Sequence, residues 1–314
     1  MPKILRIVNR FNLGGPTYSV AYLTKYLGDD FDIKLIGGKK DDFEESSEFI
    51  LQDLNIKYQI VDSMKREISF KQDRIAYKEI KKIIKEFKPD IVHTHAAKAG
   101  AIGRLAAYKM GVPVIVHTFH GHVFHSYFGK LKTSIYKIVE RYLVKRSSAI
   151  ITLSQQQQNE ICNIHKICDI KKSYAVPLGF DLDRFAERKD EKRVAFRKQW
   201  EITDETIVIG IVGRVVPIKN HQLFLDAFLS LKKATTKLVR GIVIGDGDVT
   251  KEVMDYAISI GLSVSSADKM NKDSDIIFTS WITKIDVANA GLDIMALSSL
   301  NEGTPVSLIE AQAS

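Results

Sequence analysis

The sequence predicts an α/β protein with two domains, each built around a doubly wound parallel β-sheet. Short runs rich in β-branched residues alternate with longer stretches of helical periodicity, which is the pattern of repeated βαβ units. The 314 residues are enough for two hydrophobic cores. One charged segment without a strand-like run, residues 181–205, interrupts the alternation. We therefore expect a first domain over 1–180, a connection with a surface helix over 181–205, and a second domain over 206–314.

The first domain is predicted from seven strand-like runs separated by helical stretches. These runs are short and almost continuously apolar, as expected for parallel strands that are covered on both faces. Strands are expected at 4–9, 33–37, 58–62, 91–94, 114–118, 149–153 and 174–177. Helices are expected at 17–27, 43–54, 73–87, 99–110, 131–145 and 155–164. Together they form one complete Rossmann-like domain.

The second domain repeats this rhythm without repeating the sequence. Strands are expected at 207–212, 240–244, 276–279 and 292–296, and helices at 221–232 and 250–260. A last helix opens at Pro305 and is still amphipathic at Ser314. A parallel sheet that ended there would lack its final strands, so we expect this domain to be incomplete by about one or two βα units.

Composition narrows the class of protein. Hydrophobic residues make up 45% and charged residues 27%, the balance of a soluble globular protein. The N-terminus enters a strand-like run directly, without the apolar region of a secretion signal, and we expect a cytoplasmic protein. Cys162 and Cys168 fit a reducing compartment. They are interpreted as two inert thiols on a helix rather than a zinc site with His165, because structural zinc normally takes four ligands.

A formal net charge of +8 favours anionic partners. These include nucleotides, phosphorylated lipids, membrane surfaces and nucleic acids. Charge alone does not choose among them, so the choice depends on the motifs.

The loop after the strand at 207–212 carries two cations. Parallel strands end at this edge of their sheet, which is where ligands bind. Arg214 offers a planar guanidinium that can contact two phosphate oxygens, and Lys219 adds a positive charge at the far side of the same loop. Together they can neutralise a diphosphate without a metal ion. A solvated basic loop is the alternative that these residues alone leave open.

A glycine-rich turn follows the strand at 240–244. Gly245 and Gly247 permit positive φ and close approach of the backbone to a ligand, although turns of this composition are common. Asp246 and Asp248 form an Asp-x-Asp pattern, and a second one begins at Asp181. A Mg²⁺ site would need further carboxylates or substrate phosphates, so we expect no metal at either.

The strongest signal is the segment after the strand at 292–296. Gly303 permits a tight turn, Thr304 can cap a helix, and Pro305 suits the first helical position. The resulting helix start presents free amide donors to an anion. Glu302 precedes it and Glu310 lies within it, so that the pair can accept hydrogen bonds from sugar and ribose hydroxyls. For Glu310, an ordinary solvated helix residue is the alternative.

The order and spacing of these motifs resemble the retaining family 4 glycosyltransferases. The motifs are Gly-Arg-x4-Lys from Gly213, Gly-Asp-Gly from Gly245, and Glu-Gly-x-Pro-x4-Glu-Ala from Glu302. The resemblance covers essentially the whole chain and implies the GT-B fold, in which two Rossmann-like domains face a cleft. It also implies a nucleotide-sugar donor substrate, no cofactor and no metal.

The resemblance assigns roles to the second domain. Arg214 and Lys219 are implied to bind the donor diphosphate and to act in catalysis. Glu302 is implied to contact the donor sugar, also as a catalytic residue, and Glu310 the nucleotide ribose. The remaining donor-binding residues are Gly213, Gly245, Gly247, Gly303 and Thr304.

In the first domain the same resemblance points to a glycine loop and to histidines. Gly14 and Gly15 are similar to a family loop whose amides approach the donor phosphate or the acceptor. His120 matches the catalytic histidine placed near the donor sugar, with His93 and His95 as second candidates; His95 is also assigned to the acceptor side. Zinc is the less favoured interpretation of this histidine cluster.

A basic and aromatic segment suggests how the acceptor is approached. Lys98 and Arg104 resemble a segment that meets the acceptor phosphate in polysaccharide-assembly enzymes. The following stretch suits anionic headgroups and a lipid-linked acceptor, and an ordinary amphipathic helix is the equal alternative. It contains Phe124, Tyr127, Phe128, Lys130, Lys132, Tyr136, Lys137, Arg141, Tyr142, Lys145 and Arg146.

The function expected from the resemblance is retaining sugar transfer to a glycan or polyprenyl-linked acceptor in cell-surface polysaccharide synthesis. UDP-sugar is the preferred donor and GDP-mannose the next. No protein nucleophile is evident, so charge stabilisation at the departing diphosphate is expected to supply the catalysis. Two alternatives stay open: a nucleotide-sugar 2-epimerase on the same fold, and a non-catalytic nucleic-acid-binding module. No nucleic-acid motif is present, and we expect no nucleic-acid partner, but peripheral contact with the inner face of the plasma membrane.

Overall fold

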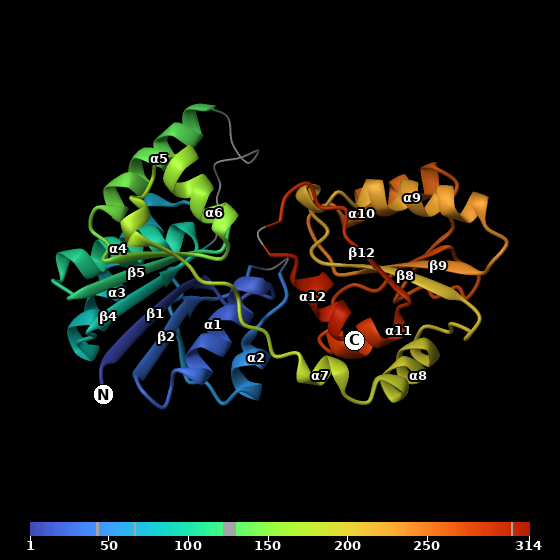
Figure 1. The fold of residues 1–314 in the computed structure, drawn as a ribbon, viewed down its shortest axis with the longest axis horizontal. Helices are drawn as coiled ribbons and strands as arrows, with labels where there is room; N and C mark the ends of the chain where they lie inside the picture. The colour runs from blue at the N-terminus through green and yellow to red at the C-terminus, as the bar shows by residue number, and fades with distance from the viewer. Residues whose placement is uncertain (42–43, 66, 122–129, 303) are drawn as a thin grey trace. The chain divides into compact units, whose positions relative to one another are not determined.

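The computed structural model describes residues 1–41, 44–65, 67–121, 130–302 and 304–314. The chain divides into two compact units, Met1–Phe180 (unit 1) and Asp181–Ser314 (unit 2), coloured blue to yellow-green and yellow to red in Figure 1. Both are parallel α/β units, as the alternating pattern predicted. No helix in the described chain is both long and apolar enough to cross a bilayer.

Unit 1 contains a parallel sheet whose seven described strands follow the order β3-β2-β1-β4-β5-β6-β7. The strand order reverses between β1 and β4, and this switch point is where ligands bind in doubly wound sheets. The strands are β1 Lys3–Arg10, β2 Asp32–Gly38, β3 Tyr58–Ile60, β4 Ile91–His95, β5 Val114–Phe119, β6 Ala149–Thr152 and β7 Ser173–Ala175. The helices are α1 Gly15–Tyr26, α2 Glu48–Asp53, α3 Phe70–Phe87, α4 Ala97–Lys109, α5 Lys130–Val144, α6 Gln155–Asn159, the π-helix η1 Glu160–Ile164 and the 3-10 helix η2 Ile170–Lys172.

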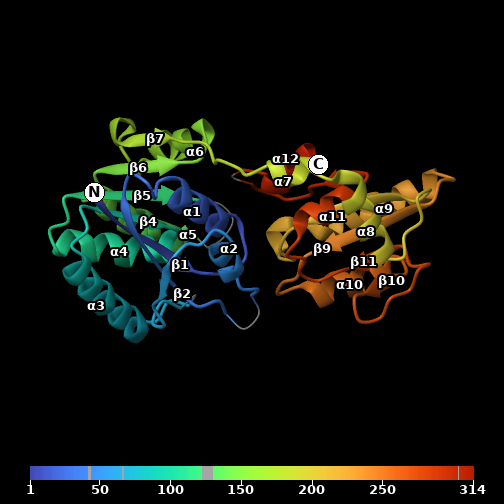
Figure 2. The same cartoon turned by 90° about the horizontal axis from the view of Figure 1, so that it is seen from below.

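The two faces of this sheet bury separate cores because successive side chains of a strand point to opposite sides. Leu5 and Ile7 of β1 pack with α3 and α4 on one face. Val8 packs with α1 and α2 on the other. Figures 1 and 2 show these helix pairs on either side of the strands. A third cluster, which includes Phe119, Val144 and Ile161, joins α5 and η1 to β5 and β6.

Unit 2 contains a second parallel sheet, in which five described strands follow the order β10-β11-β9-β8-β12. Its switch point lies between β8 and β12. The strands are β8 Ile207–Val212, β9 Val239–Ile244, β10 Val264–Ser266, β11 Ile276–Phe278 and β12 Ile294–Ala296. The helices are α7 Asp183–Ala186, α8 Lys189–Gln199, the 3-10 helix η3 Pro217–Lys219, α9 His221–Ala234, α10 Thr250–Ser259, α11 Ile285–Gly291 and α12 Val306–Ala313.

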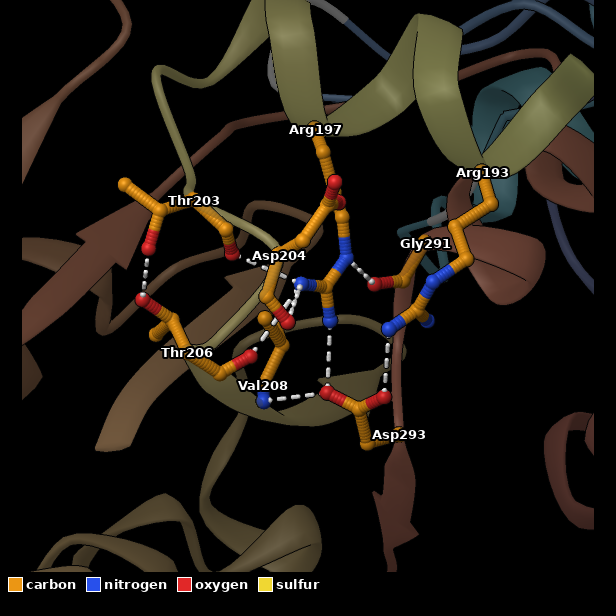
Figure 3. A network of polar contacts seen from close by, with 8 residues as sticks. All are labelled: Arg193, Arg197, Thr203, Asp204, Thr206, Val208, Gly291 and Asp293. Carbon is orange, nitrogen blue, oxygen red and sulfur yellow. Dashed lines mark hydrogen bonds and ion pairs between the residues drawn. The ribbon is translucent and has the colours of Figure 1, made fainter. Parts of the chain in front are cut away.

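The segment 181–205 folds onto unit 2 as α7 and α8. Phe185 and Phe196 are buried against β8 and β9 together with α11. The buried guanidinium of Arg197 donates to carbonyls of Thr203 and Gly291, and its Nη2 lies 2.6 Å from Asp293 Oδ2 (Figure 3). α8 therefore covers one face of the second sheet, while α9 and α10 cover the other.

Several element bounds differ from those predicted. β10 and α11 were not predicted, because one is a three-residue strand and the other a seven-residue helix. The helix predicted from residue 43 begins at Glu48. α12 begins at Val306, and its N-cap Pro305 has no side-chain cap, so Thr304 does not cap it. Cys162 lies on η1, but Cys168 lies beyond it, and both are buried free thiols.

Candidate functional sites at the two switch points

The loops after β8 and β12 meet at the switch point of the second sheet. The Leu300 amide donates to the Ile218 carbonyl at 2.9 Å, and Ser298 Oγ donates to the Lys219 carbonyl at 3.0 Å. These bonds join two segments that are about eighty residues apart in the sequence. The structure therefore brings together the Gly-Arg-x4-Lys motif and the segment before α12, both of which were predicted to bind the donor.

Lys219 and Glu302 are paired across this junction. Lys219 Nζ lies 2.5 Å from Glu302 Oε1, and both side chains are about three-quarters buried. The Lys219 side chain folds over Gly213, where a Cβ would approach its Cε to 3.6 Å. Arg214 lies half-buried in the same loop. A carboxylate that already holds the ammonium must share it with any anion that binds here.

The glycine turn after β9 packs against the loop after β8. A Cβ on Gly245, whose φ is 134°, would lie 2.1 Å from the Gly213 carbonyl oxygen, and one on Gly247 would lie 2.3 Å from that of Val215. The turn thus needs glycine for close backbone contact. Asp246 accepts hydrogen bonds from Thr250 and from Ser280, so both of its carboxylate oxygens have partners within the protein.

Glu310, which was predicted to contact the ribose, lies in surroundings that change the protonation of its carboxyl group. It lies on α12 near Arg184 and Asp286. Burial raises its pKa to about 7; Arg184 opposes this rise and Asp286 adds to it. At neutral pH the carboxyl is therefore partly protonated and can both donate and accept hydrogen bonds. Gly303 lies outside the described residues, and Thr304 is half-buried.

In unit 1, the predicted glycine loop follows β1 at the switch point. Gly14 caps α1, and a Cβ there would approach only Pro16, at 3.8 Å. Arg10, the last residue of β1, anchors the start of the loop. Its guanidinium donates two buried hydrogen bonds to the Glu44 carboxylate, at 2.9 and 2.5 Å. Gly15 is the first residue of α1. The loop is thus anchored where it leaves β1, and a side chain at residue 14 would have space around it.

The histidines form one cluster at the ends of β4 and β5. His95 Nδ1 lies 2.9 Å from His120 Nε2, and the rings of His93 and His95 lie 4.2 Å apart. His93 bonds Thr118 and His117 bonds Thr94, at 2.8 and 2.9 Å. His95 is 1% exposed, and its Nε2 has no hydrogen-bond partner among the described residues.

Burial keeps this cluster uncharged. Desolvation lowers the pKa of His120 to about 4. It also lowers the pKa of His93, His95 and His117 well below the ordinary value, with smaller contributions from Arg6 or Arg104 and from the other histidines. Each ring is therefore a neutral donor and acceptor at pH 7. Within the part of the chain that is described, no three metal-ligating side chains form a group that could hold an ion, and the absence of a metal stays a prediction.

The two basic residues assigned to the acceptor side have internal partners. Lys98 Nζ lies 2.6 Å from Asp73 Oδ1 and donates to the Lys65 carbonyl at 2.8 Å. Arg104 is fully buried and contacts Glu140 of α5 at 2.7 and 3.0 Å. The expectation that Arg104 meets an acceptor phosphate is therefore not supported, because its guanidinium is enclosed between α4 and α5.

Sequence reasoning missed two residues next to these sites. Arg6, in the middle of β1, is 1% exposed and pairs in register with His93 of β4. Burial lowers its pKa to about 10. His221, two residues after Lys219, is 3% exposed, and neither ring nitrogen has a described partner. The available signal for Arg6 was a charged residue inside an otherwise apolar strand.

Comparison with known proteins agrees with both halves of the chain. The family model for Glycosyltransferase Family 4 matches residues 13–184, and the model for Glycosyl transferases group 1 matches residues 206–314. The UDP-Gal:alpha-D-GlcNAc-diphosphoundecaprenol alpha-1,3-galactosyltransferase of Escherichia coli is 29% identical over 291 residues, which are 91% of this chain and 70% of that protein. The putative glycosyltransferase EpsF of Bacillus subtilis is 27% identical over 239 residues, covering 75% of this chain and 58% of EpsF.

Solved structures share the fold. HepE of Anabaena, in complex with UDP and glucose, superposes with a TM-score of 0.77 at 18% identity, over all of this chain and 78% of HepE. The family models and the curated relatives favour a transferase over the epimerase and the nucleic-acid-binding module that the sequence left open. The first family model alone spans more than half of the chain, and the two α/β units are those of a GT-B protein. The chain belongs to the family 4 glycosyltransferases.

Proposed function

We propose that this protein transfers a sugar from a UDP-sugar to a hydroxyl of a lipid-linked glycan, with retention of configuration at the anomeric carbon. The observation that carries the proposal is the junction at the switch point of the second sheet. There the loop with Arg214 and Lys219 is tied to the loop with Glu302. A diphosphate fits the two cations, and a sugar hydroxyl fits the carboxylate.

The donor is assigned to unit 2 on chemical grounds. Arg214 and Lys219 neutralise the diphosphate and stabilise the charge that develops as it departs. Gly245 and Gly247 let the turn after β9 pack closely on the loop after β8, which supports the loop that carries both cations. Glu310, with a pKa of about 7, can exchange hydrogen bonds with the ribose. UDP is preferred because the Escherichia coli relative is named for UDP-Gal and HepE was solved with UDP.

Unit 1 is proposed to bind the acceptor and to contribute a neutral histidine. His120 keeps an uncharged ring at pH 7, so it can hydrogen-bond the donor sugar without adding a positive charge. His95 ends β4 and Lys98 lies in the first turn of α4, and both are proposed to belong to the acceptor side. We propose that retention arises from attack on the face that the diphosphate leaves, with Glu302 paired with Lys219 rather than acting as a nucleophile.

The class of acceptor is inferred from the Escherichia coli relative described above. Its name specifies a GlcNAc joined through a diphosphate to undecaprenol. We infer a polyprenyl-diphosphate-linked glycan as acceptor, a role in cell-surface polysaccharide synthesis, and a cytoplasmic site of action. The epimerase alternative requires donor turnover without an acceptor.

The test is a transfer assay with UDP-galactose, UDP-glucose and UDP-N-acetylglucosamine, each with and without a short-chain polyprenyl-diphosphate-GlcNAc acceptor. We expect transfer from one of the three donors, only with acceptor, and an α-linkage in the product by NMR. A β-linked product would contradict retention. An epimerised nucleotide sugar formed without acceptor would contradict transfer.

A further inference from the structure

His221 is a buried imidazole without a hydrogen-bond partner. It is the first residue of α9 and is 3% exposed. Neither Nδ1 nor Nε2 has a partner among the residues that the structure describes. Buried polar side chains are nearly always hydrogen-bonded in folded proteins, and one that is not weakens the fold. The ring of His221 therefore needs a reason other than stability.

Packing does not require a polar side chain at this position. α9 buries Phe224, Leu225 and Phe228, which follow His221 by three, four and seven positions. His221 thus continues the buried face of an amphipathic helix, where an apolar residue such as leucine would satisfy the packing. The imidazole adds two polar atoms to this face, and nothing in the described chain bonds either of them.

The ring lies where α9 meets the loop that carries both cations. Lys219 ends η3, and its positive charge is close enough to act on the ring of His221. The loop after β12 is bonded to the same turn through Ser298 and Leu300. Between these two residues, Ser299 Oγ is also enclosed and has no partner within the described residues. Each of the two joined loops therefore brings unpaired polar atoms to this junction.

The start of α9 favours an anion. A helix begins with free amide donors and with the positive end of its dipole. As the structure describes this turn, Asn220 forms no side-chain cap, and no acidic residue lies among the first helical positions. The positive end of the helix is therefore not neutralised by its own residues, and it stands next to Lys219.

His221 is a neutral hydrogen-bonding group in these surroundings. Burial, and then the charge of Lys219, lower its pKa to about 4. At pH 7 one ring nitrogen carries a proton and can donate, while the other can accept. A further cation here would repel Lys219. A neutral donor adds a hydrogen bond to a phosphate oxygen without that repulsion.

We propose that His221 donates a hydrogen bond to the diphosphate of the sugar nucleotide, beside Lys219. The proposal rests on the proposed donor site in unit 2 and adds a neutral ligand to its two cations. The bond gives the buried ring the partner that the described chain does not supply. Because the ring lies near Lys219, we expect it to act on the same phosphate, the one that UDP has and UMP lacks.

The experiment is calorimetric titration of the 314-residue chain and of His221→Leu with UDP and with UMP. His221→Leu should lower the affinity for UDP by about tenfold, as expected for one hydrogen bond to a charged group, and should change the affinity for UMP little. The unfolding temperature of unit 2 should stay the same or rise, because the substitution removes an unpaired buried polar group. A purely structural role predicts a lower unfolding temperature.

Further variants identify the donating atom and control for packing. His221→Asn and His221→Gln place an amide donor near the positions of Nδ1 and Nε2, respectively, so the one that recovers part of the UDP affinity identifies the nitrogen. Phe228→Leu is the matched control on the same buried face of α9. It should lower the unfolding temperature of unit 2 without changing the ratio of the UDP and UMP affinities.

Nitrogen-15 NMR of the imidazole gives a second readout that a structural role would not move. His221 is the one histidine in residues 181–314, and the loss of its signals in His221→Leu assigns them. UDP should shift the signal of the protonated ring nitrogen. UMP should shift it much less.

The outcomes separate this proposal from the donor assignment. If the unmodified chain prefers UDP to UMP and His221→Leu binds UDP equally well, the proposal is wrong and the donor assignment stands. Ring signals that do not respond to UDP would refute it in the same way, as expected for a ring that bonds only water. Equal losses of UDP and UMP affinity, with a lower unfolding temperature, would assign His221 to folding instead. A chain that does not prefer UDP to UMP would overturn the donor assignment and this proposal together.

Discussion

Lys219 and Glu302 neutralise each other's charges. Substitution of Glu302 should therefore have opposite effects on UDP binding and on turnover. Glu302→Gln removes the carboxylate that competes with a diphosphate for the ammonium. We expect UDP to bind up to about fivefold more tightly, because partly exposed ion pairs contribute roughly 0.2–1 kcal/mol. Sugar transfer should nevertheless fall, since the contact with the donor sugar is weakened. Calorimetric titration with UDP and initial rates measure the two effects, and a parallel change in both would contradict the assignment.

His95 is expected to act as a positioning residue for His120. The bond between the two rings fixes the orientation and tautomer of His120, and His95 is enclosed by protein. His95→Phe keeps a ring of similar shape but removes the bond. Turnover should fall about fivefold to tenfold, the equivalent of one hydrogen bond of about 1 kcal/mol, with little change in the KM for donor. His95→Gln, which retains a hydrogen-bonding side chain, should recover part of the loss; a purely structural role predicts no recovery.

The same histidines make unit 1 sensitive to acid. Their folded pKa values lie below the unfolded value of about 6.5, so the unfolded chain binds more protons as the pH falls. Stability is fully present above that unfolded value and decreases toward pH 4. Calorimetry between pH 8 and pH 5 should show the unfolding temperature of unit 1 decreasing, and His93→Gln should reduce the decrease. A transition that does not move with pH would contradict burial of the neutral rings.

At the scale of elements, α8 depends on Asp293 for its attachment to the second sheet. Asp293 accepts from the Val208 amide at 2.7 Å and contacts Arg193 and Arg197 at 2.8 and 2.6 Å (Figure 3). Asp293→Ala leaves the 2%-exposed Arg197 side chain without its carboxylate. We expect about 3 kcal/mol less stability in unit 2, measured by urea unfolding of that unit's transition. Arg193→Ala, which removes the more exposed partner, should cost much less.

This network also has a pH dependence. Burial alone would raise the pKa of Asp293, but the Val208 amide, Arg193 and Arg197 outweigh it and lower the pKa below its ordinary value. The stabilisation is therefore present above the unfolded pKa of about 3.9 and is lost as the pH falls through the folded pKa. Asp293→Asn should remove the part of the acid destabilisation of unit 2 that appears below about pH 4.

The elements that were predictable from sequence are those whose local pattern agrees with their tertiary setting. β1, β8 and β9 are buried on both faces, so they are largely apolar runs, interrupted by Arg6 in β1 and Arg240 in β9. β10 is Val-Ser-Ser, with no such run, and it is defined by pairing with β11. α11 is too short to establish a helical period, and it is held by packing against α8.

The candidate site divides in the same way. Arg214, Lys219 and Glu302 belong to spaced motifs that follow strands, and the parallel topology brings those strand ends to one edge of the sheet. The pairing of Lys219 with Glu302 was not predictable, because it joins residues 83 positions apart. Arg104 was misplaced for the same physical reason: its partner Glu140 is 36 positions away. A local pattern shows a charge but not the neighbour that neutralises it.

For the whole molecule, the central claim is that unit 2 recognises the diphosphate of a sugar nucleotide through Lys219. The most direct measurement is calorimetric titration of the chain and of Lys219→Met with UDP and with UMP. UDP should bind the unmodified chain more tightly than UMP does. Lys219→Met should lower the affinity for UDP by about tenfold to a hundredfold, since hydrogen bonds to charged groups contribute roughly 1.5–3 kcal/mol. UMP binding should change little. Equal affinities for UDP and UMP, or an unchanged affinity of Lys219→Met for UDP, would contradict the claim.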